Sequence, residues 1–185
     1  LGCAQLTVFN YLRPSTGTRD DMAKFLVIQA ARFGDLVQTK RLLLSLAGRG
    51  EVHLAVDAGL VSLARLLYPF AELHALSVHG GPQAEALARN AAVLARWRGE
   101  QFDAVYNCNF SGTTAALCRV FEEAQVCGYR PCAGGITRSP WALLAFRISE
   151  RRALAPLNLV DFWAPFAPQP VPPHTVNPVA TPGGQ

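Results

Sequence analysis

The sequence predicts an α/β domain in three layers, with helices on both faces of a mostly parallel sheet. Short apolar segments typical of strands alternate with segments of helical spacing, and the connections between them are short. Such alternation favours parallel strands joined by right-handed crossovers. Half of the 185 residues are hydrophobic and only 16% are charged, so the chain can fill the core of one ordinary domain.

The first strand is the clearest element. Residues 25–28 are apolar and partly β-branched, as expected for a strand buried on both faces, and helical spacing begins at Leu36. Gly48 and Gly50 close this helix, and Gly80-Gly81-Pro82 introduces the third one. The predicted strands are residues 24–30, 51–57, 72–78, 102–108 and 124–128. The predicted helices are residues 35–47, 58–67, 82–98, 112–120, 139–150 and 156–166. This order predicts a Rossmann-like fold.

The composition divides the chain into three parts. Residues 1–21 are expected to be a leader, either disordered or upstream of the natural start at Met22, the only methionine. Residues 22–166 are expected to form the Rossmann-like domain. Seven of the residues from 165 to 185 are proline. A segment of this composition cannot bury a core, so residues 167–185 are predicted to be a linker toward a further C-terminal domain.

Charge and cysteine content limit the partners and the compartment. The net charge of +4 suits anionic lipid headgroups or phosphorylated sugars and is too small to indicate nucleic acid. Five cysteines without a Cys-x-x-Cys pair indicate neither a disulfide framework nor a zinc site, which favours a reducing cytoplasm. Cys108 and Cys118 are expected to be small buried hydrophobic residues. No apolar run reaches the roughly 20 residues of a membrane-spanning helix.

Several chemistries lack their motifs. No Gly-x-Gly-x-x-Gly and no P-loop follows the first strand, which argues against a dinucleotide or nucleoside triphosphate site there. Ser111 is not in a Gly-x-Ser-x-Gly elbow. The four histidines, His53, His74, His79 and His174, show no i, i+4 pair, so no metal site is predicted.

Asp35 falls at the carboxyl end of the first strand and at the start of the first helix, where ligands bind in open α/β sheets. As a structural residue it would cap the helix, and as a functional residue it would face a ligand. Asn107 and Asn109 lie at the end of a later strand. One of them is expected to point to the same edge as Asp35, either donating to a ligand or satisfying loop backbone.

Three segments together resemble glycosyltransferase family 9, the heptosyltransferase-like enzymes of lipopolysaccharide core assembly. Residues 26–39, Leu-Val-Ile-Gln-Ala-Ala-Arg-Phe-Gly-Asp-Leu-Val-Gln-Thr, are similar to the start of the family's first strand and helix. Residues 102–112 resemble its Tyr-Asp-Leu-Val-Ile-Asp-Leu-Gln-Gly segment, and residues 126–130 its Arg-Ile-Gly-Tyr segment. The segments occur in the family's order between Met22 and about Phe166.

The resemblance implies the N-terminal half of a GT-B glycosyltransferase that is inverting and metal-independent and needs no cofactor. Its donor would be a nucleotide-sugar of the ADP-heptose type, and its acceptor a lipopolysaccharide-core or similar glycan or glycolipid. Asp35 would be the catalytic general base, and Arg32, Gly34, Asn109 and Ser111 would bind substrate. The enzyme would be cytoplasmic and in peripheral contact with the inner membrane surface.

This chain departs from the family pattern before the Gly-Asp pair, where Ala31-Arg32 replaces Ser-Ser and Gln29 replaces a basic residue. These positions face the acceptor in the family, so a different acceptor is compatible with the sequence. The donor would be held mainly by the second domain, and this fragment alone is expected to be inactive. The alternative is a stand-alone α/β binding module without transferase activity.

Overall fold

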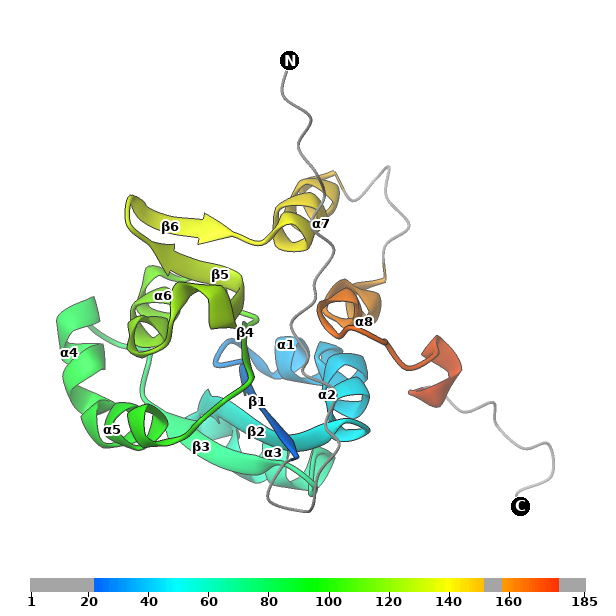
Figure 1. The fold of residues 1–185 in the computed structure, drawn as a ribbon, viewed down its shortest axis with the longest axis horizontal. Coiled ribbons are helices and arrows are strands. Elements are labelled where there is room, and N and C mark those ends of the chain that lie inside the picture. Colours follow the sequence, from blue (N-terminus) through cyan, green and yellow to red (C-terminus); the bar gives the residue numbers. More distant parts are fainter. Residues whose placement is uncertain (1–21, 152–157, 177–185) are drawn as a thin grey trace.

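The computed structural model describes residues 22–151 and 158–176 of the chain. It confirms the α/β fold class. The sheet has six strands in the order β3-β2-β1-β4-β5-β6, and all neighbouring pairs are parallel except β5 and β6. Helices cover both faces of the sheet (Figure 1). The predicted leader, residues 1–21, lies outside the described residues.

The strands are β1 (Ala23–Ile28), β2 (Gly50–Asp57), β3 (Glu72–Leu76), β4 (Ala104–Asn107), β5 (Val126–Cys132) and β6 (Gly135–Arg138). The α-helices are α1 (Phe33–Gln38), α2 (Lys40–Ala47), α3 (Val61–Leu67), α4 (Gln83–Arg89), α5 (Ala91–Gly99), α6 (Gly112–Leu117), α7 (Pro140–Glu150) and α8 (Leu159–Phe162). Short 3₁₀ turns are η2 (Ala58–Leu60), η3 (Cys118–Val120), η4 (Glu123–Gln125), η6 (Ala164–Phe166) and η7 (Pro173–Thr175).

The sheet separates two apolar clusters. Phe25 and Val27 of β1 face a cluster that includes residues of α1, α2, α3, α7 and α8, whereas Leu26 and Ile28 face one that includes residues of α5 and α6. Successive side chains of a strand point to opposite faces, and all four of these residues are fully buried. The first strand therefore lies at the centre of the domain, as its unbroken apolar run predicts.

Two predicted helices are each divided by a polar residue. Thr39 separates α1 from α2, and its hydroxyl donates to the carbonyl of Asp35 at 2.7 Å. Asn90 separates α4 from α5, and its amide donates to the carbonyls of Ala86 and Ser77. Short polar side chains compete with the backbone for hydrogen bonds, which explains both breaks.

Strand β6 was not predicted. It follows β5 through a short turn over Ala133-Gly134 and pairs antiparallel with it, adding an edge strand to an otherwise parallel sheet. Gly135 has φ +127°, a conformation that glycine adopts readily. Gly128 of β5 has φ +93°, and a Cβ there would lie 2.2 Å from the carbonyl oxygen of Asn107. Glycine is therefore required where β5 passes β4.

The domain continues to pack beyond residue 166. Ala167 belongs to the core on the α2 side, and the backbone N–H of Val171 donates to Ser45 Oγ at 2.9 Å. Arg41 Nε donates to the carbonyl of Val171 at 2.6 Å. Residues 177–185 of the predicted linker lie outside the described residues.

Cys108 and Cys118 are buried, as predicted, and burial raises the pKa of both thiols, that of Cys118 to about 12. These thiols are therefore protonated at neutral pH and unsuited to act as nucleophiles. Among the helices of the described segments, none combines the length and the apolar character needed to cross a membrane.

Candidate functional site at the carboxyl edge of the sheet

The residues singled out in the sequence lie at one edge of the sheet. Ile28 at the end of β1 pairs with Asn107 at the end of β4, so both strands end together. The loop residues that follow are joined directly, because Asn109 Oδ1 accepts a hydrogen bond from the backbone N–H of Ala30 at 3.0 Å. Arg32, Gly34 and Asp35 at the start of α1 and Asn109 and Ser111 before α6 therefore share this edge.

Asp35 is the third residue of α1, not its N-cap. The helix begins two residues earlier than predicted, and the extended residue Arg32 is the N-cap. Asp35 Oδ2 accepts a hydrogen bond from the backbone N–H of Arg32 at 3.2 Å, as acidic residues at the third helical position commonly do. The side chain is partly exposed, and Oδ1 has no hydrogen-bond partner within the described residues. One oxygen thus orients the carboxylate and the other is free to accept a proton.

Gly34 and Arg32 flank this carboxylate and are both exposed. A Cβ on Gly34 would have no atom within 4 Å, so the packing of the domain does not require glycine there. The guanidinium of Arg32 forms no ion pair with the described part of the chain. The edge therefore combines a free carboxylate oxygen, an unobstructed backbone position and an unpaired cation.

The side chains of Asn107 and Asn109 form hydrogen bonds within the domain. Asn109 Nδ2 donates to the carbonyl of Ile28 at 2.8 Å and to Asn107 Oδ1 at 3.1 Å. Asn107 Nδ2 donates to the carbonyl of Tyr129 at 2.7 Å. These bonds tie the ends of β1, β4 and β5 together. Asn109 is buried, and its hydrogen bonds position the ends of the strands. Its contact with substrate stays a prediction.

Ser111 is the N-cap of α6. Its Oγ accepts from the backbone N–H of Thr114 at 3.1 Å and lies 3.0 Å from Thr114 Oγ1. The residue is exposed, so the hydroxyl can still meet a ligand from the solvent side.

Two further residues at this edge were named in the sequence but were not assigned these contacts. Gln29, at a position expected to face the acceptor, is fully buried directly after β1. Its Nε2 donates to Thr39 Oγ1 and to the carbonyl of Cys108, which supports α1 behind Asp35. His79 follows β3, and its Nε2 lies 3.0 Å from the carbonyl of Ala30 and 3.9 Å from Asp57 Oδ2. The neighbours of these two residues along the sequence do not indicate such contacts.

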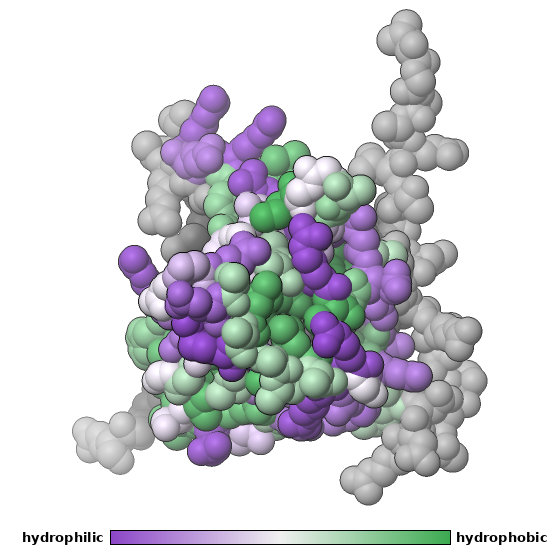
Figure 2. Space-filling model, turned by 90° about the vertical axis from the view of Figure 1, so that its left-hand side faces the viewer, coloured by the Kyte–Doolittle hydropathy of each residue, from purple (hydrophilic) through white to green (hydrophobic). Residues whose placement is uncertain are grey.

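Apolar surface gathers at the same edge. The arrows of β2 and β3 point to the left of Figure 1, and Figure 2 views that side, where hydrophobic residues occupy the centre and polar residues surround them. Among the residues of elements at this edge, Phe33 is 60% exposed and Ile136 is 41% exposed. Ile136 lies beside Gly112, at the start of α6. A ligand bound here would meet both apolar and polar groups.

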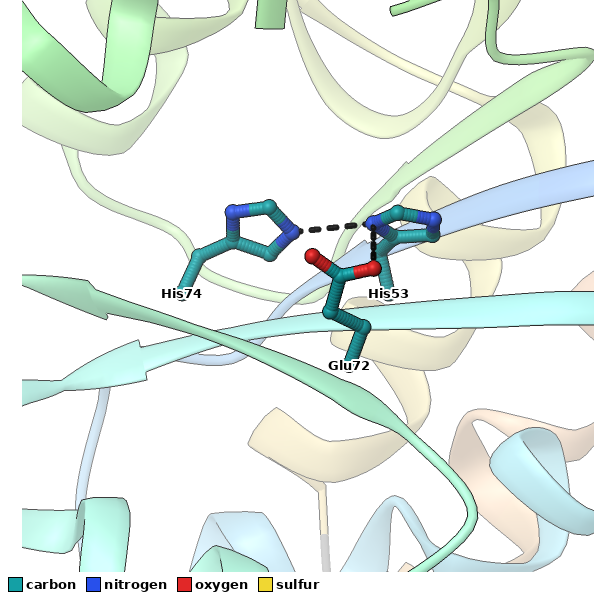
Figure 3. A group of neighbouring side chains, drawn as sticks. All are labelled: His53, Glu72 and His74. Carbon is teal, nitrogen blue, oxygen red and sulfur yellow. Dashed lines mark hydrogen bonds and ion pairs between the residues drawn. The ribbon is translucent and has the colours of Figure 1, made fainter. Parts of the chain in front are cut away.

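A second cluster lies away from this edge. His53 of β2 and His74 of β3 are buried, with 3.0 Å between His53 Nδ1 and His74 Nε2 (Figure 3). Together with Glu72 they form a group whose possible metal-ligand atoms lie within 4.8 Å of one another. The histidines are scattered along the sequence, but the parallel register of β2 and β3 brings two of them together. The signal that could have found them is the repeated Glu-x-His of residues 51–53 and 72–74.

No protein-family model and no curated protein sequence matches this chain. Two solved structures resemble it. A glycosyl transferase family 9 structure from Veillonella parvula DSM 2008 has 16% identity and a TM-score of 0.49, over 57% of this chain and 31% of that one. A ribokinase-like superfamily protein from Enterococcus faecalis V583 has 12% identity and a TM-score of 0.42, over 63% of this chain and 39% of that one. This chain thus matches less than half the length of each, and neither similarity bears on activity.

Proposed function

We propose that this chain is the acceptor-binding half of an inverting, metal-independent glycosyltransferase, with Asp35 as the general base. The observation that carries the proposal is the state of the Asp35 carboxylate. Oδ2 is fixed by the Arg32 backbone, whereas Oδ1 is unpaired at the carboxyl edge of a parallel sheet. The sequence segments that resemble glycosyltransferase family 9 include this Gly-Asp pair and the Asn109–Gly112 loop on the same edge.

The reaction requires a bond exchange that Asp35 can assist. The acceptor hydroxyl oxygen forms a bond to the anomeric carbon of the donor while the bond from that carbon to the nucleotide phosphate breaks. Attack comes from the face opposite the nucleotide, so the configuration inverts. Asp35 Oδ1 takes the hydroxyl proton and later releases it to water, and the nucleotide diphosphate leaves. Positioned proton transfer of this kind contributes about 10²- to 10⁴-fold in rate.

The residues beside Asp35 suit an anionic glycan. Gly34 leaves room for the acceptor to approach the backbone, and Arg32 would pair with a phosphate or an acidic-sugar carboxylate. The Ser111 hydroxyl would bind a sugar hydroxyl, and Asn109 would hold the loops in register. A lipopolysaccharide-core type of acceptor and an ADP-heptose type of donor fit this arrangement, with the donor bound mainly by a second domain. The enzyme would work in the cytoplasm at the inner membrane surface.

Acceptor binding is the first test, since it needs this chain alone. A phosphorylated core oligosaccharide should shift the amide NMR signals of residues 32–35 and 109–112 and leave those of α5 unchanged. Transfer is then measured with both halves present, using a nucleotide-heptose donor. A chain that binds such glycans but supports no transfer in the two-domain protein would be the alternative, a stand-alone binding module. Absence of any shift at the carboxyl edge would contradict both functions.

A further inference from the structure

The repeated Glu-x-His segments place four side chains on one face of the sheet. Residues i and i+2 of a strand point the same way, and His53 is directly opposite Glu72 in the register of β2 and β3. His53 is 1% exposed and His74 is 3% exposed, while the side chain of Glu72, on edge strand β3, is 39% exposed. Helix α5 covers this face and contributes Arg96 and Trp97.

The hydrogen bonds of the histidine pair fix both tautomers. The indole N–H of Trp97 can only donate, and it lies 3.3 Å from His74 Nδ1, so this nitrogen is the acceptor. A neutral His74 then carries its proton on Nε2 and donates to His53 Nδ1 at 3.0 Å. His53 in turn carries its proton on Nε2 and donates to Glu51 Oε1 at 3.1 Å. The bonds run in one direction, from Trp97 to Glu51.

The same directionality argues against a metal ion between His53, Glu72 and His74. A cation on His74 Nε2 would move the remaining proton of that neutral ring to Nδ1. This proton would then face the N–H of Trp97, which is fully buried and cannot turn away. Metal-bound histidines normally donate their second N–H to an acceptor, and His74 has a donor there instead.

Charged groups around the pair connect it to the surface. Glu72 Oε1 pairs with Arg96, and Arg96 Nε lies 3.8 Å from Glu100 Oε1. Lys24 of β1 pairs with Glu100 at 3.2 Å and with Glu51 at 3.8 Å. Phe102 packs edge-on against the His53 ring. Glu72 Oε2 lies 3.7 Å from His53 Nδ1.

We propose that Trp97, His74, His53 and Glu51 form an acid-operated latch that holds helix α5 on edge strand β3. A proton added to His74 must go to Nδ1, because Nε2 already carries one, and it then faces the N–H of Trp97, so two donors are opposed. The charged ring also repels Arg96 of the same helix. Helix α5 then loses its Trp97–His74 bond and moves away from β3.

The environment of His74 agrees with this direction. Burial, as the largest cause, acts with the charges of the neighbouring groups to lower the pKa of His74 from 6.5 to about 4, although Glu72 and Glu100 act the other way. A neutral His74 is therefore the state that the folded domain favours.

The tautomers provide the first test. In the ¹⁵N spectrum of the imidazole rings of the full chain at pH 7, both His53 and His74 should be in the Nε2–H form. Co²⁺ at one equivalent should give no tetrahedral d–d absorption. An Nδ1–H form of either ring, or a Co²⁺ band that disappears in His74→Gln, would overturn the latch and indicate a metal site.

The second test is opening of α5 in acid, followed by amide hydrogen exchange. Protection factors of α5 and β3 should fall by about tenfold or more relative to those of α2 between pH 6.5 and pH 4.5. In His74→Gln, whose amide can accept from Trp97 and donate to His53, this differential loss should be absent. In the exposed control His79→Gln it should persist. Equal loss of protection in α2 and α5 would contradict the latch, as would an unchanged differential in His74→Gln.

Discussion

Asp35 Oδ2 accepts a hydrogen bond from the backbone N–H of Arg32, three residues earlier, at 3.2 Å. This bond satisfies the amide of the N-cap and at the same time fixes the direction of the carboxylate. The structural role and the proposed catalytic role therefore use different oxygens of one side chain. Substitutions that affect the two oxygens differently can separate the roles.

The first prediction concerns Asp35 in a two-domain protein that joins this chain to the proposed second half. Asp35→Asn keeps an acceptor for the Arg32 N–H but removes the base, so kcat should fall by about 10²-fold or more with little change in melting temperature. Asp35→Ala removes both and should also cost about 1 kcal/mol of stability. Turnover and melting temperature are measured on the same samples. If Asp35→Asn turns over at a near-normal rate, Asp35 serves only the start of the helix.

Gly34 offers a test without a change of charge. It is the second residue of α1, and a Cβ there meets no atom within 4 Å, so Gly34→Ala should leave the domain as stable or more stable by up to about 1 kcal/mol. Acceptor affinity should nevertheless fall, because the methyl group occupies the space that the acceptor needs. Urea unfolding and glycan titration provide the two readouts. Normal affinity in both Gly34→Ala and Gly34→Val would show that the acceptor does not approach here.

Part of this site could be predicted from the sequence, because its location depends on the order of strands and helices. Alternating strands and helices imply parallel strands, and the carboxyl ends of parallel strands share an edge, so Asp35 and Ser111 were expected at the same edge. The structure adds that their strands, β1 and β4, are neighbours. The helix start at Phe33 was missed because Arg32, the N-cap, lacks the short polar side chain typical of that position.

Other features depend on partners far away in the sequence. The side-chain amide of Asn109 forms hydrogen bonds with the backbone of Ile28 and Ala30, about 80 residues earlier. Asn90 accepts a hydrogen bond from the backbone N–H of Ser77, 13 residues earlier. Periodicity describes only neighbours along one element, so it could show neither contact. The His53–His74 pair was missed for the same reason, since only the register of β2 and β3 makes the two rings adjacent.

Arg32 should determine affinity for an anionic acceptor. Arg32→Gln should weaken binding of a phosphorylated glycan by about tenfold or more, because a charge-assisted hydrogen bond is lost. Arg32→Lys should recover part of this loss, since the charge remains but the planar fork does not. The difference between the unsubstituted chain and Arg32→Gln should shrink as salt is raised. Equal affinities for the neutral and phosphorylated glycans would rule out this role.

Asn109 should contribute to the stability of the domain more than to ligand binding. Asn109→Ala leaves the N–H of Ala30 without its partner, at about 1–3 kcal/mol, whereas the carbonyl of Ile28 keeps its bond from the backbone N–H of Cys108. Ser111→Ala removes only a helix cap and should cost about 1 kcal/mol. Chemical unfolding of the two variants side by side gives the comparison. A loss in Asn109→Ala no larger than that in Ser111→Ala would mean that the strand ends do not depend on this amide.

The last prediction is the pH dependence of stability. Burial lowers the pKa of His74 from 6.5 to about 4, so the unfolded chain binds a proton in this range that the folded domain does not. Stability from this group is therefore fully present above about pH 6.5 and is lost as the pH falls toward 4, by up to about tenfold in the folding equilibrium per pH unit. Glu100, whose pKa is lowered by its hydrogen bond to Lys24, adds acid sensitivity only below the ordinary glutamate value of 4.5.

Urea unfolding between pH 7 and pH 5 thus isolates the histidine contribution to the pH dependence of stability. His74→Gln should flatten the dependence in that interval, whereas His79→Gln should not. A slope that is identical in the unsubstituted chain and in His74→Gln would show that His74 takes up its proton as easily in the folded state as in the unfolded one.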